Sequence, residues 1–85
     1  MELSEEMRHR LTTAFGPTAL EVEDVSEAHR GHGGWREGGG THWRVAIRAP
    51  ALGGMSRIAR HRAIHATLGP ALIGRIHALS IEASG

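Results

Sequence analysis

The stretch THWRVAIR, residues 41–48, has the alternating pattern of a half-buried β-strand. The apolar side chains of Trp43, Val45 and Ile47 recur at every second position, with more polar residues between them. Successive side chains of a strand point to opposite faces of a sheet, so this pattern predicts one face in the core and one toward solvent. The segments before and after this strand decide how a sheet is built around it.

Two elements are predicted before this strand. Leu20 and Val22 alternate with glutamates, which indicates a strand that runs to about Val25. Earlier apolar residues recur at helical spacing and predict a helix that Ser4 caps and that Gly16 ends. These apolar residues are Leu3, Met7, Leu11, Ala14 and Phe15. Because a non-helical connection joins the two predicted strands, we expect them to pair antiparallel.

The connection between these strands is rich in glycine and histidine and contains GHGG, residues 31–34. Its length of about 15 residues is typical of a loop that is functional or disordered. GHGG has the GxxG spacing with which KH domains clamp a nucleotide backbone, but in those domains the motif joins two helices. The preferred interpretation is that the glycines keep a long loop mobile.

A second helix and a third strand are predicted after residue 48. Pro50 interrupts the strand, Ser56 offers an N-cap, and a helix is expected from there to Leu68. The stretch RIHALSIEA, residues 75–83, alternates again and predicts a strand with His77 at its entry. A strand, helix, strand connection favours parallel pairing with a right-handed crossover. The predicted fold is therefore α+β, with the order α-β-β-α-β, a three-stranded mixed sheet and both helices on one face.

The composition indicates one small domain over residues 1–85. A chain of 85 residues builds a thin core, which leaves little volume for the deep cleft of an enzyme. The chain has no cysteine and therefore supplies no thiolate to a metal. No apolar stretch reaches the roughly 20 residues needed to cross a bilayer, and the acidic start is unlike a secretory signal, so a cytoplasmic protein without membrane contact is expected.

His61 and His65 are spaced one helical turn apart within the predicted second helix. Projected on a helical wheel, they share a stripe with Ile58, Ile64 and Leu68. This spacing lets two imidazoles share a metal, but no carboxylate follows His61 as it does in a metalloprotease helix. Partly buried structural histidines, or histidines that face a partner, are the preferred interpretation.

Four segments of the chain closely resemble the BolA family. They are DVSEAH at residues 24–29, THWRVAI at 41–47, GMSRIARHRAIH at 54–65 and IHALSIEA at 76–83. The likeness extends from the first predicted helix to Ala83, with the motifs in the family's order and at nearly its spacing. The chain departs from the family in its longer loop, in Leu52, where Phe is usual, and in His65, where many members have Tyr.

The resemblance implies a KH-like fold of class II and partnership with a monothiol glutaredoxin and glutathione, with which family members bind a bridging [2Fe-2S] cluster. The family's C-terminal histidine ligand maps onto His77, and its loop ligand maps onto His29, with His32 as the alternative. The residue inventory agrees, because two imidazoles can replace two cysteines on one iron, as in Rieske centres. Since this chain lacks thiols, we expect it to bind no cluster alone, and to be a monomer or weak homodimer.

The predicted function is that of a non-enzymatic BolA-like adaptor in iron–sulfur cluster trafficking or iron-status regulation. The resemblance also implies an alternative, a KH-like DNA-binding transcription regulator that uses the basic second helix. Its contacts would be Arg57, Arg60 and Arg62, and the formal net charge of +1 permits this role without requiring it. A stand-alone zinc site formed by the three histidines named above as candidate cluster ligands is least favoured, because three neutral ligands form a weak closed site.

Overall fold

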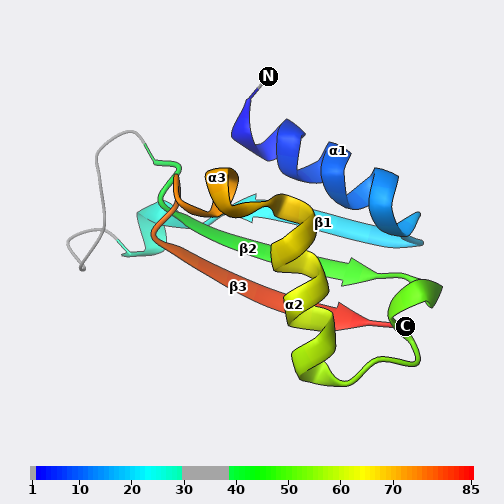
Figure 1. Ribbon diagram of the computed structural model, residues 1–85. Coiled ribbons are helices and arrows are strands. Elements are labelled where there is room, and N and C mark those ends of the chain that lie inside the picture. Colours follow the sequence, from blue (N-terminus) through cyan, green and yellow to red (C-terminus); the bar gives the residue numbers. More distant parts are fainter. Residues whose placement is uncertain (1, 30–38) are drawn as a thin grey trace.

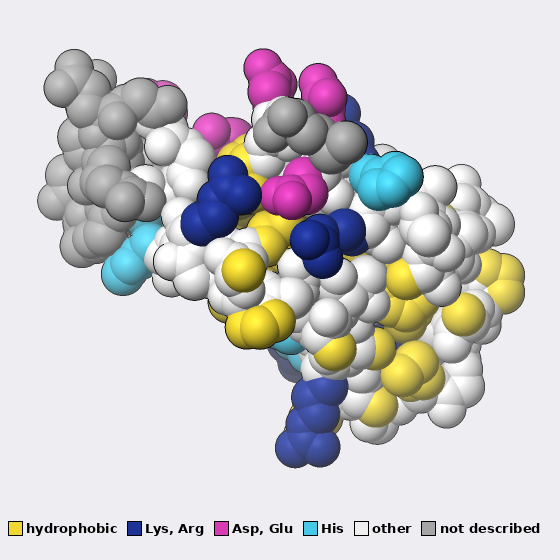
Figure 2. Space-filling model, turned by 45° about the horizontal axis from the view of Figure 1, so that its top comes forward, with side chains coloured by type: hydrophobic (Ala, Val, Ile, Leu, Met, Phe, Trp, Pro, Cys, Tyr) yellow, Lys and Arg dark blue, Asp and Glu magenta, His cyan; other side chains and the backbone are white. Residues whose placement is uncertain are grey.

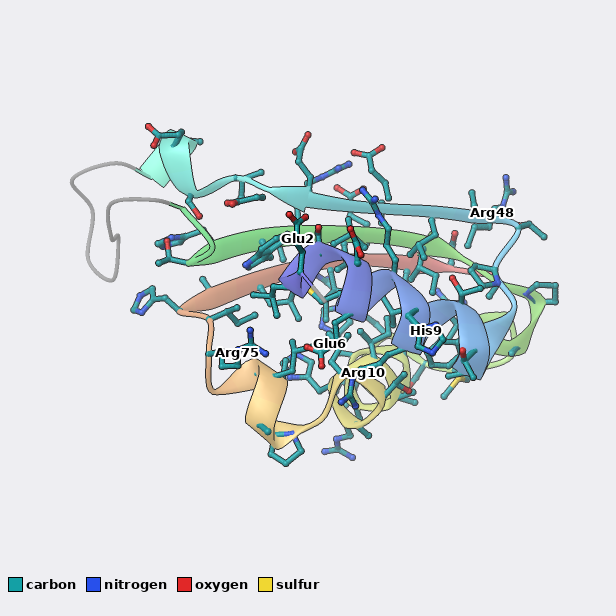
Figure 3. All side chains as sticks on the ribbon, turned by 90° about the horizontal axis from the view of Figure 1, so that it is seen from above. Glu2, Glu6, His9, Arg10, Arg48 and Arg75 are labelled. Atoms are coloured by element: carbon teal, nitrogen blue, oxygen red, sulfur yellow. The ribbon has the colours of Figure 1, made fainter. Side chains whose placement is uncertain are left out.

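The computed structural model describes residues 2–29 and 39–85, with His29 described by its backbone alone. One mixed sheet of three strands is covered on one face by helices (Figure 1; Figure 3). The elements are α1 (Leu3–Phe15), β1 (Ala19–Asp24), η1 (Ser26–His29), β2 (His42–Arg48), η2 (Pro50–Leu52), α2 (Arg57–Leu68), α3 (Pro70–Ile73) and β3 (Ala78–Ser84). The predicted α+β class and element order are confirmed, while GHGG lies outside the described residues.

β2 is the middle strand of the sheet, which has the order β1-β2-β3. It pairs antiparallel with β1 and parallel with β3, as predicted. Trp43, Val45 and Ile47 are buried beneath the helices. The buried apolar residues that pack into one core are Met7, Leu11, Val22, Trp43, Val45, Ile47, Ala49, Leu52, Ile64, Leu68 and Leu72. Both neighbours of β2 are therefore aligned on a strand whose alternate side chains form the centre of the core.

The uncovered face of the sheet is held by ion pairs across the strands. Arg44 of β2 donates to Glu21 of β1 at 2.6 Å and to Glu82 of β3 at 3.4 Å. The hydrogen bond to Glu21, together with the nearby carboxylates, raises the pKa of the Arg44 guanidinium above its ordinary value. Glu21 and Glu82 both stand opposite Ala46, so the two ion pairs run diagonally between neighbouring strands.

The first helix ends as predicted but begins differently. Gly16 has φ +53°, a left-handed conformation in which glycine is favoured, and its N–H donates to Thr12 O at 3.0 Å. The prediction that Ser4 caps the helix is wrong, because the N-cap is Glu2 and Ser4 lies within the first turn. The apolar spacing begins at Leu3, so the helix starts one residue before the serine.

The second helix has its predicted cap, and its buried stripe lies elsewhere than predicted. Ser56 Oγ accepts the Ala59 N–H at 3.1 Å. Of the expected stripe, Ile64 and Leu68 are buried and His61 is half-buried, but Ile58 is 65% exposed and His65 is exposed. The helix is rotated about its axis, so that a polar side chain takes the place expected for Ile58.

That side chain is Arg60, which turns toward the loop after β2 and the end of β3. Its guanidinium donates to three backbone carbonyls, Leu52 O at 2.8 Å, Ala83 O at 3.2 Å and Gly53 O at 3.4 Å. Hydrogen bonds from a charged donor are stronger than those between neutral groups, so they hold this side chain inward. These three bonds give the physical reason for the rotation of α2.

The short helix α3 was not predicted. Pro70 occupies its first turn, where the missing N–H of proline costs nothing, and Leu72 is buried in the core. Behind it, Glu6 of α1 lies between Arg10 and Arg75, at 3.8 Å and 3.3 Å (Figure 3). Acidic and basic side chains are intermixed on this side of the molecule (Figure 2). The ion pair between Glu6 and Arg75 connects α1 to the segment that leads into β3.

No helix in the described part of the chain is long and apolar enough to span a bilayer.

The two isoleucines of α2 test the observed rotation of this helix. Ile64→Ala should lower the free energy of unfolding by about 2–5 kcal/mol, because it empties a fully buried site. Ile58→Ala, the matched control in the first turn, should change it by less than about 0.5 kcal/mol. Urea denaturation followed by circular dichroism measures both, and equal losses would contradict the observed orientation.

Candidate functional site

Three strand ends meet at one end of the sheet (Figure 1). Asp24 at the end of β1 is paired with Trp43, and His42 at the start of β2 is paired with Ala78. The turn η1 follows β1 here, and His77 immediately precedes β3. The end of β1 and the starts of the segments 41–47 and 76–83 are therefore brought together here.

Ser26 is the hydrogen-bonding centre of this end. It is 1% exposed, and its Oγ donates to Asp24 Oδ1. The same oxygen accepts the backbone N–H groups of Thr41 at 2.9 Å and His42 at 3.1 Å. One buried hydroxyl thereby joins the end of β1 to the start of β2, and its loss would leave buried donors without a partner.

The Asp24 carboxylate holds both ends of the connection between β1 and β2. Oδ1 accepts the Ser26 N–H at 2.9 Å, and Oδ2 accepts the Gly40 N–H at 2.9 Å. Burial alone would raise the pKa of this carboxyl, but the hydrogen bonds from Ser26 and Gly40 outweigh it and hold the pKa below its usual range. A Cβ on Gly39, which has φ +80°, would stand 2.9 Å from Oδ2, so a side chain there would disturb the carboxylate.

His77 is bound to the same network through its backbone. The Thr41 carbonyl accepts the N–H of His77 at 2.8 Å and that of Ala78 at 3.2 Å. The His77 side chain is exposed. Its ring centroid lies 5.2 Å from that of His42, with the two planes tilted by 54°. An accessible imidazole therefore projects from a backbone that is held by hydrogen bonds.

The family model described as BolA-like protein matches residues 11–85. The chain belongs to the BolA-like family.

Known relatives match this BolA-like chain along most of its length. A protein from Sinorhizobium sp., described as an uncharacterized protein in the cobS 5' region, is 46% identical over 83 residues, which are 96% of this chain and 89% of that protein. BolA-like protein 1 of Pongo abelii is 39% identical over 77 residues, 91% of this chain, and the chain spans only 53% of that protein. The structure of the BolA domain of SufE1 from Arabidopsis thaliana superimposes with a TM-score of 0.83 at 38% identity, covering 99% of this chain and 92% of that one.

The structure describes the predicted metal ligands of this BolA-like chain to different extents. His77 is exposed at the end of the sheet, as a ligand must be. The backbone of His29 ends η1 at the same end of the sheet, whereas His32 lies outside the described residues. Among the side chains that the structure describes, no three histidines or carboxylates form a metal site. The assignment of His77 as a ligand and the choice between the two loop histidines both stay predictions.

Sequence reasoning missed the position of His42. The alternation of β2 placed it on the polar side of the strand, yet it is only 4% exposed. Its Nδ1 lies 2.9 Å from Thr41 Oγ1. The only sequence signal was the Thr41-His42 pair at the start of a strand, because burial here depends on the packing of segments distant in the chain.

The three arginines proposed to contact DNA differ in exposure and in their hydrogen bonds. Arg57 and Arg62 are exposed on α2. Arg60 is half-buried and bonded to the backbone carbonyls of Leu52, Gly53 and Ala83, and its assignment as a phosphate contact stays a prediction. These bonds use three of the five N–H donors of the guanidinium, so it offers fewer donors to a phosphate than Arg57 or Arg62.

A shallow groove of about 610 Å³ lies at the other end of the strands from His77. The side chains of Arg57, Arg60 and His61 line it together with the strand ends. The exposed imidazole of His77 thus stands on the surface, away from this hollow.

The depressed pKa of Asp24 predicts a contribution to stability that depends on pH. A carboxyl whose pKa is lower in the folded state stabilises the fold above its unfolded pKa of about 3.9, and this contribution is lost as pH falls through the folded value. The unsubstituted chain should therefore be more stable than Asp24→Asn at pH 6, and the difference should narrow as pH falls from about 5 to about 2.

Urea midpoints measured across this pH range test the expectation. Glu23→Gln, which removes an exposed carboxylate from the same strand, controls for the change in net charge. If the difference in urea midpoint between the unsubstituted chain and Asp24→Asn stays constant down to pH 2, the role of the ionised carboxylate is contradicted.

Proposed function

We propose that this chain is a BolA-like adaptor that pairs with a monothiol glutaredoxin and shares a bridging [2Fe-2S] cluster through histidine ligands. It would serve iron–sulfur cluster trafficking or iron-status regulation. The observation that carries this proposal is the exposed His77 imidazole at the end of the sheet where the turn that ends at His29 also lies, with β2 between the two segments. The two nominated ligand positions thus belong to segments that meet at one end of the fold.

The donors of this chain fit a cluster that is shared. Four ligands hold a [2Fe-2S] cluster, and most of them are thiolates. The chain has no cysteine and seven histidines, so it offers nitrogen and no sulfur. A glutaredoxin cysteine and glutathione would supply the remaining thiolates, and the imidazole of His77 with one loop imidazole would complete the set. When bound, the cluster would supply electron transfer or be handed on to another protein.

The fixed and the adjustable ligand have different structural settings. His77 is tied through its N–H to Thr41, whose own N–H is tied to the buried Ser26. The loop ligand belongs to the long glycine-rich connection, whose two ends are joined by Asp24. A preorganised ligand reduces the ordering cost of binding, while a glycine-rich segment can adapt to a partner's surface.

A relative gives further support for an iron–sulfur role. SufE-like protein 1 of Arabidopsis thaliana, a chloroplastic and mitochondrial protein, is 41% identical over 81 residues, and this chain spans 22% of it. We take the SufE-like name of the protein that carries this related BolA domain as support for an iron–sulfur role of the domain. We extend that association to the present chain as part of the proposal.

DNA binding by α2 is the second candidate. The exposed side chains of Arg57 and Arg62 favour it, because exposed guanidinium groups are available to backbone phosphates. The retention of Arg60 by internal carbonyls reduces the basic surface on which that alternative was based.

Co-purification with a monothiol glutaredoxin and glutathione tests the proposed function. The mixture should give a brown heterodimer with visible absorption and circular dichroism, and His77→Ala should change that spectrum and speed cluster loss because a ligand is removed. His9→Ala, an exposed histidine on α1, is the matched control and should leave the spectrum unchanged (Figure 3). A colourless mixture with the unsubstituted chain would count against the proposal.

The same experiment distinguishes the loop ligands. His29→Ala and His32→Ala, compared in the same complex, identify the second ligand by the variant whose spectrum changes. Unchanged spectra in both would show that the chain supplies a single nitrogen.

A further inference from the structure

A buried histidine stands beside the exposed ligand candidate. His42 is 4% exposed, and its ring centroid lies 5.2 Å from that of His77 with a tilt of 54°. Rings at this separation and tilt are within the range in which aromatic pairs attract each other. The surface of the His42 ring is therefore one wall against which the His77 ring rests.

His42 itself is held in a fixed orientation. Its Nδ1 lies 2.9 Å from Thr41 Oγ1, and that hydroxyl lies 3.2 Å from Ser26 Oγ. Ser26 Oγ in turn donates to the Asp24 carboxylate. The backbone N–H of His42 is bonded to the same serine at 3.1 Å. Ring, backbone and hydrogen-bond chain thus leave His42 little rotational freedom.

The His77 side chain has no comparable restraint from its own backbone. Thr41 O holds the N–H of His77 at 2.8 Å, which places the Cα of the residue but does not select a side-chain rotamer. An exposed side chain changes rotamer within nanoseconds unless a neighbour restricts it. Among the described side chains, His42 is the ring that contacts His77.

We propose that His42 is a positioning residue, whose locked ring holds the His77 imidazole in the orientation in which it meets a metal centre. The inference rests on the proposed function for its purpose, but its structural content concerns the isolated chain. Supporting groups that orient a metal ligand contribute strongly to metal affinity in proteins generally. His42 would act in this way through ring contact and need not touch the metal.

Two variants of similar volume separate the ring contact from simple filling of space. His42→Leu fills the buried site without an aromatic face, and His42→Phe restores that face without the nitrogen. In the isolated chain, the χ1 rotamer populations of His77 can be measured from three-bond couplings in NMR spectra. One rotamer should dominate in the unsubstituted chain and in His42→Phe, whereas His42→Leu should average over staggered rotamers.

The outcomes in the isolated chain are decisive. His77 couplings that are the same in His42→Leu and in the unsubstituted chain would overturn the positioning role, as would averaging in a folded His42→Phe. His42→Met, which also lacks an aromatic face, gives a second test if His42→Leu does not fold. It should broaden the His77 rotamer distribution, and an unchanged distribution would overturn the positioning role. His9→Leu is the control on α1 (Figure 3).

The complex with glutaredoxin gives an independent readout. Loss of the cluster to a chelator should be about 10-fold faster with His42→Leu than with the unsubstituted chain. The rate with His42→Phe should be close to that of the unsubstituted chain. Equal rates for all three would overturn the link between His42 and metal binding. If the unsubstituted chain forms no cluster, the proposed function fails, and the rotamer measurement on the isolated chain alone decides whether His42 positions His77.

Discussion

The buried hydroxyl of Ser26 is the interaction on which the functional end of this molecule depends. It receives two backbone N–H groups from the start of β2 and donates to the carboxylate at the end of β1. A polar group removed from water must find partners inside the protein, and here the partners are the strand ends themselves. The hydrogen bonds of one side chain therefore fix the register of two strands and the base of the connection between them.

The third strand joins this arrangement through Thr41. Its N–H is bound to Ser26, and its carbonyl accepts the N–H groups of His77 and Ala78. The position of His77 thus follows from a chain of contacts that begins at Asp24. This end of the sheet combines a histidine whose backbone is held by hydrogen bonds with a neighbouring segment rich in glycine. The combination suits a protein whose proposed metal centre is completed by a partner.

Much of the fold could be predicted because it depends on local rules. Alternation in β2, the Ser56 cap of α2 and the glycine that ends α1 each rely on neighbours in the chain. The predicted orientation of α2 was wrong because it depends on contacts with residues distant in the chain. Arg60 takes an inward position on α2 because its guanidinium donates to the backbone carbonyls of Leu52 and Ala83, which the pattern of apolar residues along the helix does not reveal.

The sequence by itself determined the α+β order, the pairing of the strands and the absence of thiol ligands, since periodicity, connection type and residue inventory require no tertiary contacts. It also nominated His77 through the resemblance to the BolA family. Only the tertiary structure decided that His77 is exposed while His42 is buried, although both stand at strand entries. The physical reason is that burial and ring contact depend on which segments pack together in space, and hydrogen bonds between residues far apart in the chain set that packing.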